Sequence, residues 1–204
     1  MITIIDYGLG NIRAFANVYE RLNIPVSVAK TADDLMAAIK IILPGVGAFD
    51  YAMSKLNNSG MREPLDKLVL DHQVPVLGIC VGMQILAQSS EEGILPGLGW
   101  IDGTVIKFDV SVLNSKTQLP HMGWNTIHPI NSNPLLVNFS NDSQLYFLHS
   151  YYFQCNNQND TIATTEYGIQ FSSALNNKNI YGVQFHPEKS HQWGIQLLKN
   201  FSDL

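Results

Sequence analysis

The stretch VPVLGICVGMQIL, residues 74–86, joins an apolar run to a single cysteine that has a glycine two positions away on either side. Residues 74–79 are apolar and rich in valine and isoleucine, which predicts a buried strand. Residues 81–88 predict a helix, so Cys80 is expected at the turn between the two. In an open α/β sheet this turn lies at the carboxyl edge, where such folds bind ligands. This stretch therefore predicts both the fold class and the position of a site.

Gly78, Cys80 and Gly82 form the pattern Gly-x-Cys-x-Gly, which is typical of a nucleophile elbow with sulfur in place of the serine oxygen. Glycines suit this turn because a Cβ at either position would collide with neighbouring backbone. The partial positive charge at the start of the next helix favours a thiolate, and the Val81 amide would point toward a developing oxyanion. A small buried cysteine would fit the same pattern. Cys155, which has no flanking glycine, is predicted to be structural.

The first half of the chain alternates strand-like and helix-like segments. Strands are predicted at 2–5, 25–29 and 41–43, and helices at 11–22, 31–39 and 49–70, the last with a break near 57–60. Such alternation predicts a parallel sheet with right-handed helical crossovers. The second half predicts short strands at 104–108, 124–128, 144–148, 151–154, 161–165, 171–176 and 180–184, then a helix at 191–201. We therefore expect one domain, residues 1–204, of the α/β class, with helices on both faces of a mostly parallel central sheet and added antiparallel hairpins.

Composition narrows the function classes. The chain has 204 residues, 46% of them hydrophobic, and a formal net charge of −5. That charge and the lack of a Lys/Arg run argue against nucleic acid as the main partner. Two cysteines cannot build a disulfide framework, and the longest apolar run is shorter than the ~20 residues that a membrane helix needs. The N-terminal sequence has no signal-peptide pattern, so we expect a cytoplasmic protein without membrane association.

A thiolate nucleophile needs an acid or base, usually a histidine held by a third group. The most informative of the six histidines is His186, in YGVQFHPE at 181–188. An apolar strand ends there, Pro187 prevents helix continuation, and the Glu188 carboxylate can turn back onto the imidazole. An ordinary surface His-Pro turn is the alternative.

Seven stretches, taken together, carry a family resemblance. They are DYGLGNI at 6–12, LPGVGAF at 43–49, GICVGMQIL at 78–86, GLGWI at 97–101, PHMGWN at 120–125, HSYY at 149–152 and YGVQFHPEKS at 181–190. The chain resembles the class I, triad-type glutamine amidotransferases, which have a flavodoxin-like fold. Within that family it is most similar to the glutaminase subunits of imidazole glycerol phosphate synthases. The stretches occur in family order and span nearly the whole chain.

The resemblance implies a reaction and its catalytic residues. Cys80 would attack the side-chain amide of glutamine and form a glutamyl thioester. His186 would act as the general acid and base, and Glu188 would orient it. Glutamate and ammonia would be the products.

The resemblance also implies binding residues. The oxyanion would be bound by the amide of Val81 and by the loop that contains Val46 and Gly47. Gly45, Gln84, Ser150 and Tyr151 would contact glutamine. Gln84 could instead be a surface or capping residue, and residues 150–152 an ordinary strand. His121 and His149 lie in the matching stretches, and we expect them to be structural or interface residues.

No cofactor or metal is expected. No Cys/His set has zinc spacing, and Gly8-Leu9-Gly10-Asn11 lacks the Lys-Ser/Thr of a phosphate loop. The resemblance implies one partner, a (β/α)8-barrel cyclase that would form a heterodimer with this chain and use its ammonia in histidine biosynthesis. Interface residues would be Asn11, Trp124, Tyr146 and Lys189.

Three other functions remain open at this stage. A paralogous synthase that amidates a nucleotide-linked sugar for surface polysaccharide would use the same chemistry, and Asp102 and Val81 mildly favour it. A catalytically silent partner-binding module is disfavoured because Cys80, His186 and Glu188 are all present. A stand-alone cysteine hydrolase is disfavoured by the interface-type motifs.

Overall fold

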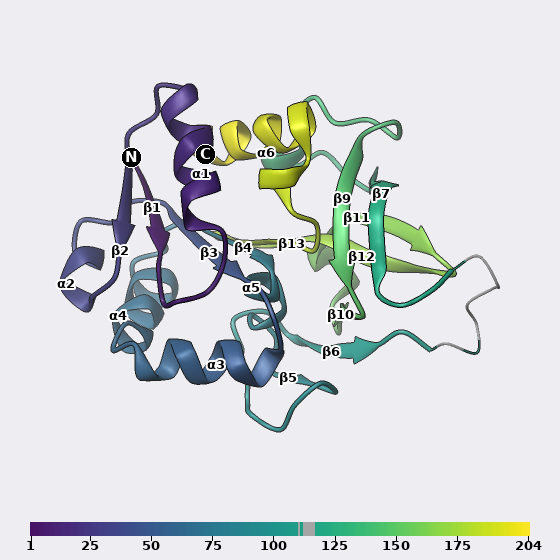
Figure 1. Cartoon of the computed structure of the whole chain (residues 1–204), viewed down its shortest axis with the longest axis horizontal. Helices are drawn as coiled ribbons and strands as arrows, with labels where there is room; N and C mark the ends of the chain where they lie inside the picture. Colours follow the sequence, from purple (N-terminus) through teal and green to yellow (C-terminus); the bar gives the residue numbers. More distant parts are fainter. Residues whose placement is uncertain (110, 112–116) are drawn as a thin grey trace.

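The computed structural model describes residues 1–109, 111 and 117–204, and one long sheet runs through it (Figure 1). The strand order is β2-β1-β3-β4-β13-β12-β10-β6-β5, with β11 paired to β12 and β8 paired to β11. The bounds are β1 Ile2–Ile5, β2 Val26–Ala29, β3 Ile41–Gly45, β4 Val76–Cys80, β5 Ser89–Ser90, β6 Gly103–Lys107, β8 His128–Pro129, β10 Tyr151–Cys155, β11 Thr161–Tyr167, β12 Ile169–Asn177 and β13 Ile180–Val183.

The half of the sheet from β2 to β13 is parallel. Apart from the edge strand β2, which is partly exposed, its strands are buried and mostly apolar, as expected for a sheet covered on both faces. From β13 onward the pairings β13–β12, β12–β10 and β10–β6 are antiparallel, and β6–β5 is parallel again. The predicted α/β class, with a mostly parallel core and added antiparallel hairpins, is confirmed.

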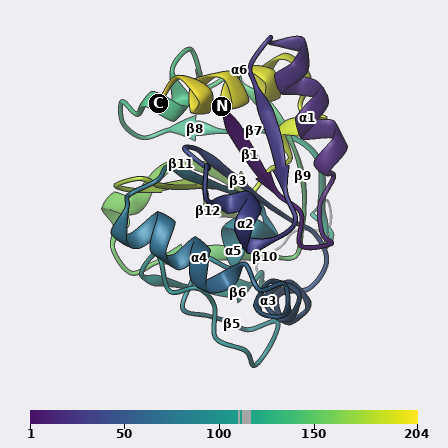
Figure 2. The same cartoon turned by 90° about the vertical axis from the view of Figure 1, so that its left-hand side faces the viewer.

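Helices cover both faces of the parallel half (Figure 2). Helices α1 and α6 lie on one face, and α3 and α4 lie on the other. The bounds are α1 Ile12–Arg21, α2 Ala32–Leu35, α3 Phe49–Asn58, α4 Arg62–Asp66, a π-helical turn η1 Lys67–Asp71, α5 Val81–Gln84 and α6 His191–Asp203, with short 3-10 turns η2 Pro134–Leu136, η3 Gln158–Asp160 and η4 Pro187–Lys189. Within the described residues, no helix is long and apolar enough to cross a membrane.

A separate two-stranded antiparallel sheet pairs β7, His121–Thr126, with β9, Gln144–His149. Its register sets Met122 opposite Leu148 and Trp124 opposite Tyr146. The sequence predicts a strand at 124–128, but β7 begins three residues earlier. The reason is that β9 supplies partners for the whole segment from His121 to Thr126.

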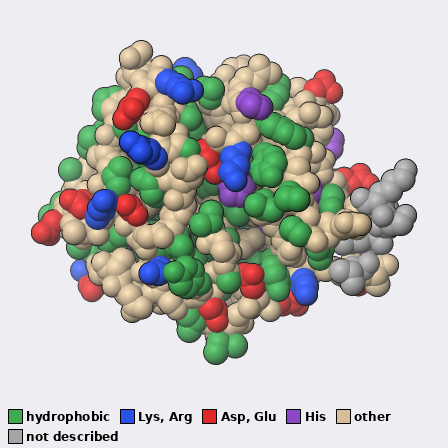
Figure 3. Space-filling model, in the orientation of Figure 1, with side chains coloured by type: hydrophobic (Ala, Val, Ile, Leu, Met, Phe, Trp, Pro, Cys, Tyr) green, Lys and Arg blue, Asp and Glu red, His purple; other side chains and the backbone are tan. Residues whose placement is uncertain are grey.

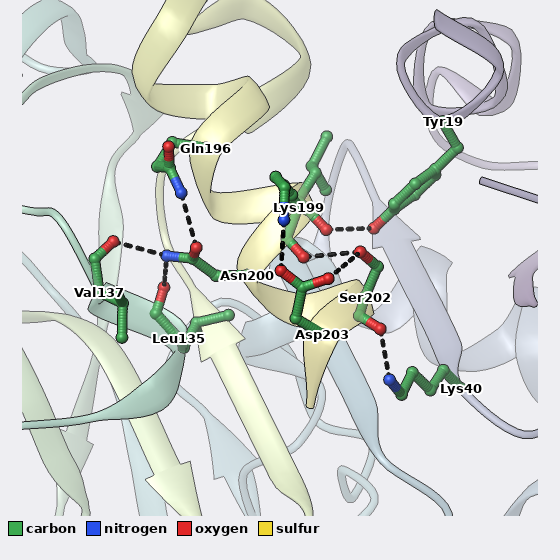
Figure 4. A network of polar contacts seen from close by, with 10 residues as sticks. Tyr19, Lys40, Leu135, Val137, Gln196, Lys199, Asn200, Ser202 and Asp203 are labelled. Carbon is green, nitrogen blue, oxygen red and sulfur yellow. Dashed lines mark hydrogen bonds and ion pairs between the residues drawn. The ribbon is translucent and has the colours of Figure 1, made fainter. Parts of the chain in front are cut away.

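The C-terminal helix α6 is anchored by polar contacts to distant backbone (Figure 4). The buried Asn200 amide donates to the carbonyls of Leu135 and Val137 at 3.0 and 2.8 Å. The Tyr19 hydroxyl of α1 donates to the carbonyl of Leu198 at 3.2 Å. The Asn200 contacts satisfy two carbonyls that lie outside α6. Together with the Tyr19 contact, they fix α6 against α1 and η2.

The hairpin between β12 and β13 is tied to the chain in front of β4. The Asn179 amide donates to the carbonyls of Val69 and Val74, at 2.8 and 3.0 Å. The pairing that follows aligns Ile180 with Val76 and Val183 with Ile79.

Two predicted helices are too long. The helix expected at 81–88 ends at Gln84. The amides of Leu86 and Ala87 donate to carbonyls only three residues back, and the Gln88 amide donates to the Gly103 carbonyl of β6 rather than to Gln84. The helix expected at 31–39 ends at Leu35, although Thr31 and Asp34 form a capping box. Met36 and Ile39 are exposed, so further turns would bury little apolar surface. The break predicted in 49–70 is present between α3 and α4.

Candidate active site

Cys80 is the last residue of β4. Its backbone has φ 56° and ψ −114°, a region of backbone conformation that residues other than glycine rarely adopt. Helix α5 begins at the next residue, so the chain bends sharply at the sulfur. A Cβ on Gly82 would lie 2.0 Å from the Leu43 carbonyl oxygen, and one on Gly78 would lie 2.5 Å from the Gly82 oxygen. The bend therefore requires glycine at both positions that the sequence pattern singles out.

His186 and Glu188 complete a buried chain of three side chains with Cys80. The His186 Nδ1 and Glu188 Oε1 atoms are 3.0 Å apart, and both side chains are at most 5% exposed. Burial by itself lowers the pKa of His186, but hydrogen bonds and charge interactions with Cys80 and Glu188 outweigh it and raise the pKa to about 10. The arrangement thus favours the imidazolium form of His186, between the sulfur of Cys80 and the side chain of Glu188.

The backbone on both sides of His186 is held by hydrogen bonds. Its amide donates to the Tyr146 carbonyl at 2.8 Å, and its carbonyl accepts from the Ser190 hydroxyl at 2.6 Å. The same Ser190 hydroxyl accepts from the Tyr146 amide at 2.9 Å. The turn η4 then brings Glu188 back toward the imidazole. Strand β9 and this turn together fix the imidazole in front of the sulfur.

The sulfur and the imidazole open into a cavity of about 300 Å³. It gathers residues from six stretches of the chain: Val46, Gly47, Cys80, Val81, Gln84, Glu92, Pro120, Leu148, His149, Ser150, Tyr151, His186 and Lys189. Among the residues predicted to act in catalysis or substrate binding, Gly45 and Glu188 lie outside this lining. Glu188 stands behind His186, and Gly45 is buried against Gly82, whose nitrogen would lie 2.2 Å from a Cβ on Gly45. Gly45 thus allows the loop and the elbow to approach each other.

The loop 44–47 is held by the first loop of the chain. The buried Tyr7 hydroxyl donates to the Pro44 carbonyl at 2.7 Å. Burial raises the pKa of Tyr7 well above its usual value, and the charge of Cys80 adds to the effect, so Tyr7 stays a donor. After Pro44 the chain reaches Val46 and Gly47, and Gly47 has φ +87°. Tyr7 therefore positions the segment predicted to supply an oxyanion donor.

Comparisons of the whole chain with known proteins identify its family. The family model for "Glutamine amidotransferase class-I" matches residues 3–203. The chain belongs to the class-I glutamine amidotransferase family. Imidazole glycerol phosphate synthase subunit HisH of Bdellovibrio bacteriovorus is 60% identical over 205 residues, and that of Leptospira interrogans is 52% identical over 204, with 100% of both chains covered each time.

Solved structures with low identity share the fold. PurLQS from Thermotoga maritima matches with a TM-score of 0.74 at 16% identity, over 99% of this chain and 97% of that one. A crystal structure of another glutamine amidotransferase matches with a TM-score of 0.75, also at 16% identity and over 99% and 97% of the two chains. At such identities the likeness concerns the amidotransferase fold alone.

Cys155, the second cysteine of this amidotransferase, provides a contrast to Cys80. It is buried at the end of β10, and the Thr161 hydroxyl donates to its sulfur at 3.5 Å. Burial raises the pKa of the Cys155 thiol. It lies outside the cavity lining, as expected of a structural cysteine.

Glu92 lines the amidotransferase cavity, although no sequence motif predicts it there. Its Oε2 accepts a hydrogen bond of 2.8 Å from the Phe49 amide, at the first residue of α3. Lys189 lines the same cavity, so the cavity carries both a carboxylate and an ammonium group. The acidic doublet Glu91-Glu92 just before Gly93 is the only signal in the sequence. Within the described ranges, no three His, Cys, Asp or Glu side chains are grouped to hold a metal ion.

His121 and His149 form a buried pair at the cavity wall, which His149 helps to line. The His121 Nδ1 and His149 Nε2 atoms are 2.9 Å apart, and His149 Nδ1 is 2.8 Å from the Tyr151 carbonyl. Burial lowers the pKa of His121 to about 4. Burial also lowers the pKa of His149, to about 3, and the nearby His121 and His186 add to that effect. Both imidazoles are therefore neutral at ordinary pH.

The four residues predicted to contact a partner fall into two groups. Trp124 packs edge-on against Tyr146 with ring centroids 6.1 Å apart, and the Lys189 ammonium lies 5.6 Å from the Tyr146 ring. Asn11 instead caps helix α1 by accepting from the Ala14 amide at 3.3 Å. Hydrophobic side chains gather over strands β7 and β9 on one face of the amidotransferase (Figure 3). The exposed members of this face are Met122, Trp124 and Leu148.

Proposed function

We propose that this chain is the glutaminase subunit of an imidazole glycerol phosphate synthase. The observation that carries the proposal is the buried Cys80–His186–Glu188 arrangement at the bottom of an open cavity. Full-length relatives at 60% and 52% identity bear the name of that subunit, which supports the choice of synthase.

In the first step, the Cys80 thiolate attacks the side-chain amide carbon of glutamine. A C–S bond forms, and the carbonyl π electrons move onto oxygen to give a tetrahedral oxyanion. The His186 imidazolium then donates its proton to the amide nitrogen, the C–N bond breaks, and ammonia leaves. The product on the enzyme is a glutamyl thioester, and His186 is left neutral.

In the second step, neutral His186 takes a proton from water, and the hydroxyl oxygen attacks the thioester carbon. A second oxyanion forms, the C–S bond breaks, and the product leaves as the γ-carboxylic acid, which gives its remaining proton to solvent and becomes glutamate. The proton stays on His186, so the thiolate–imidazolium pair is restored. Glu188 keeps the imidazole in the orientation that both transfers need, since its Oε1 holds Nδ1 and leaves Nε2 for the reaction.

Both oxyanions need hydrogen-bond donors close to the attacked carbon. The Val81 amide begins α5 directly after the sulfur, and Val46 and Gly47 line the opposite wall of the cavity. We assign the donors to Val81 and to this loop. Tyr7 supports the loop from behind through its bond to the Pro44 carbonyl.

The rest of the cavity suits the charged end of glutamine. Glu92 offers a carboxylate to the α-ammonium group, and Lys189 offers an ammonium to the α-carboxylate. Gln84, Ser150 and Tyr151 line the same cavity, which supports their assignment to substrate binding. Gly45 contributes by allowing close packing of the loop rather than by contact.

Ammonia released into water is protonated and lost, so we propose that this glutaminase works while docked to a (β/α)8-barrel cyclase in the cytoplasm. The exposed apolar face of Met122, Trp124 and Leu148, together with Tyr146 and Lys189, adjoins the cavity and is the proposed docking surface. Asn11, in the first loop, is proposed to lie at its rim.

One sequence argument for the nucleotide-sugar alternative has a local explanation. Asp102 closes a loop against β10 through two bonds to Asn156. Its side chain accepts from the Asn156 amide group at 2.8 Å, and its backbone carbonyl accepts from the Asn156 backbone amide at 3.1 Å. Its identity is therefore accounted for by local pairing.

The test is an assay of the chain purified together with the barrel cyclase of its own organism. Wild type should release glutamate from glutamine and drive formation of imidazole glycerol phosphate. Cys80→Ser should lose at least about a thousandfold of glutamine-dependent turnover, because removal of the nucleophile leaves only residual catalysis. The same variant should keep turnover with added ammonium salt. Glutamate release by Cys80→Ser at the wild-type rate would refute the mechanism, and failure of the two chains to associate would refute the assigned partner.

A further inference from the structure

Gln184 is a fully buried amide directly beside the nucleophile. It follows β13, whose last residue Val183 is paired with Ile79, so it comes level with Cys80 at the end of β4. Its Nε2 lies 3.8 Å from the Cys80 sulfur. The Gln184 backbone amide donates to the Ser173 carbonyl at 3.0 Å, which fixes the side chain's origin.

The orientation of the Gln184 amide follows from its second neighbour. Gln84 Nε2 donates to the Gln184 Oε1 at 3.1 Å and to the Tyr151 carbonyl at 3.0 Å. A carbonyl only accepts, so the nitrogen of Gln84 must face Tyr151. Its second N–H then needs an acceptor, which places the oxygen of Gln184 toward Gln84 and the Gln184 nitrogen toward the sulfur.

The same bonds decide which atom Gln84 presents to the cavity. Both of its N–H groups are committed to internal acceptors, and the residue lines the cavity. Its carbonyl oxygen is the remaining polar atom. An oxygen in that position suits the α-ammonium group of an amino-acid substrate.

We propose that Gln184 is a catalytic residue, which donates a hydrogen bond to the Cys80 thiolate and holds Gln84 in the orientation that binds substrate. This inference rests on the proposed glutaminase function. The proton of the thiol goes to His186, and Gln184 keeps both of its own. A fixed N–H donor in a buried site stabilises the sulfur anion before attack and each time the thioester breaks.

Two variants separate the two contributions. Gln184→Met removes the donor to sulfur and the acceptor for Gln84. Gln184→Glu keeps the acceptor and the size but puts a carboxylate against the sulfur. Thr161→Val is the matched control, since it removes the donor to the other cysteine sulfur, that of Cys155.

The first measurement is the rate of alkylation of Cys80 by iodoacetamide against pH, with the modified residue identified by mass spectrometry. In both Gln184 variants the pH of half-maximal rate should rise by about one unit, because a donor to the anion is lost. Thr161→Val should match wild type. If Gln184→Met does not fold, the Glu variant alone decides. Unchanged alkylation profiles in the folded variants would overturn the role at the sulfur.

The second measurement is the steady-state hydrolysis of glutamine. We expect kcat to fall about 10- to 100-fold in both variants, and KM to rise in Gln184→Met only. An equal KM in wild type and Gln184→Met would overturn the orienting role. Alkylation does not depend on the substrate, so its result also separates this inference from the proposed function. An upward shift in a protein that does not hydrolyse glutamine would refute the function alone.

Discussion

The hydrogen bond between His121 and His149 has a direction that both of its ends determine. On one side, the Asn125 nitrogen donates to the Glu166 carbonyl at 3.0 Å and so also donates to His121 Nε2 at 3.2 Å. On the other side, His149 Nδ1 must carry a proton to bond the Tyr151 carbonyl. His121 Nδ1 is therefore the donor to His149 Nε2. The chain of donors runs from Asn125 to the carbonyl of Tyr151.

This pair should make the protein less stable in acid. Both pKa values, about 4 for His121 and about 3 for His149, lie below the usual value of the unfolded chain. The unfolded state therefore binds more protons below about pH 6.5, and stability falls as pH decreases. We expect a loss on the order of 1–2 kcal/mol per histidine between pH 6.5 and 5, measured by urea unfolding. His121→Phe, which keeps an aromatic ring between Tyr167 and Phe147, should show a shallower dependence. The control is His72→Gln, at an exposed position, for which the pH dependence of stability should match wild type. Equal slopes of stability against pH in wild type, His121→Phe and His72→Gln would contradict the prediction.

Glu188→Gln should lower kcat less than His186→Ala does. The amide removes the charge that orients and stabilises the imidazolium, while the proton carrier stays in place. We expect a fall of about 100- to 10,000-fold for Glu188→Gln and a larger one for His186→Ala, from steady-state glutaminase assays. The pKa of His186 should also decrease in Glu188→Gln, as followed by NMR titration of the imidazole. Equal losses in both variants would count against the assigned roles.

Tyr7→Phe should reduce activity beyond its effect on stability. Loss of the hydroxyl leaves the Pro44 carbonyl without its 2.7 Å donor and frees the loop that follows. We expect a stability loss of about 1 kcal/mol and a kcat about tenfold lower, with KM little changed. The control is Tyr19→Phe, another buried hydroxyl that donates to a backbone carbonyl, 3.2 Å away at Leu198. Tyr19→Phe should lose a similar amount of stability but keep the kcat of wild type. If the two variants have the same kcat, Tyr7 does not position the loop.

Gly82→Ala should prevent stable folding of the elbow. The added methyl would lie 2.0 Å from the Leu43 oxygen, which belongs to a paired strand and cannot move aside. We expect a destabilisation of about 3 kcal/mol or more, as for an overpacked core. Gly60→Ala is the comparison, because Gly60 also occurs in a tight segment, with φ +75°, but has open space around its Cβ position. It should cost about 1 kcal/mol in thermal unfolding, and a similar loss in both would exclude the steric explanation.

Trp124→Ala should weaken association with the cyclase. Trp124 is 46% exposed at the centre of the apolar face, and large aromatic residues dominate binding at interface centres. The Kd measured by calorimetry should rise about 10- to 100-fold. Tyr51→Ala removes a similarly exposed aromatic side chain from α3 and should leave the Kd unchanged. The proposed surface is incorrect if the two variants bind equally well.

The parts of the fold that depend on local pattern are predictable from the sequence. The parallel strands are continuous apolar runs, and the elbow at Cys80 has a glycine pattern with a steric reason. Helix α5 is shorter than its pattern because the Gln88 amide bonds the Gly103 carbonyl of β6 and not the preceding turn, which is information that lies outside the helix. Long-range packing overrides local propensity in such cases.

The site is less predictable where residues act through neighbours. Glu92 is held by a backbone amide 43 positions away, and Gln184 acts through Cys80 and Gln84. Glu92 is marked in the sequence only by its acidic doublet, and Gln184 lies in the stretch 181–190, where the pattern points to His186 and Glu188 instead. His121 and His149 are recognisable as motif members, but their neutral state follows only from burial.

The tie from Asn179 to the backbone in front of β4 has a consequence for the catalytic residues at the opposite end of the same strands. A slip of β13 by one residue against β4 would turn every side chain of that strand to the other face. The imidazole-bearing end of the chain would then face away from the sulfur. Asn179 therefore helps to fix the register of β13 against β4. Although it lies far from the catalytic residues, it contributes in this way to the distance between the nucleophile and the base.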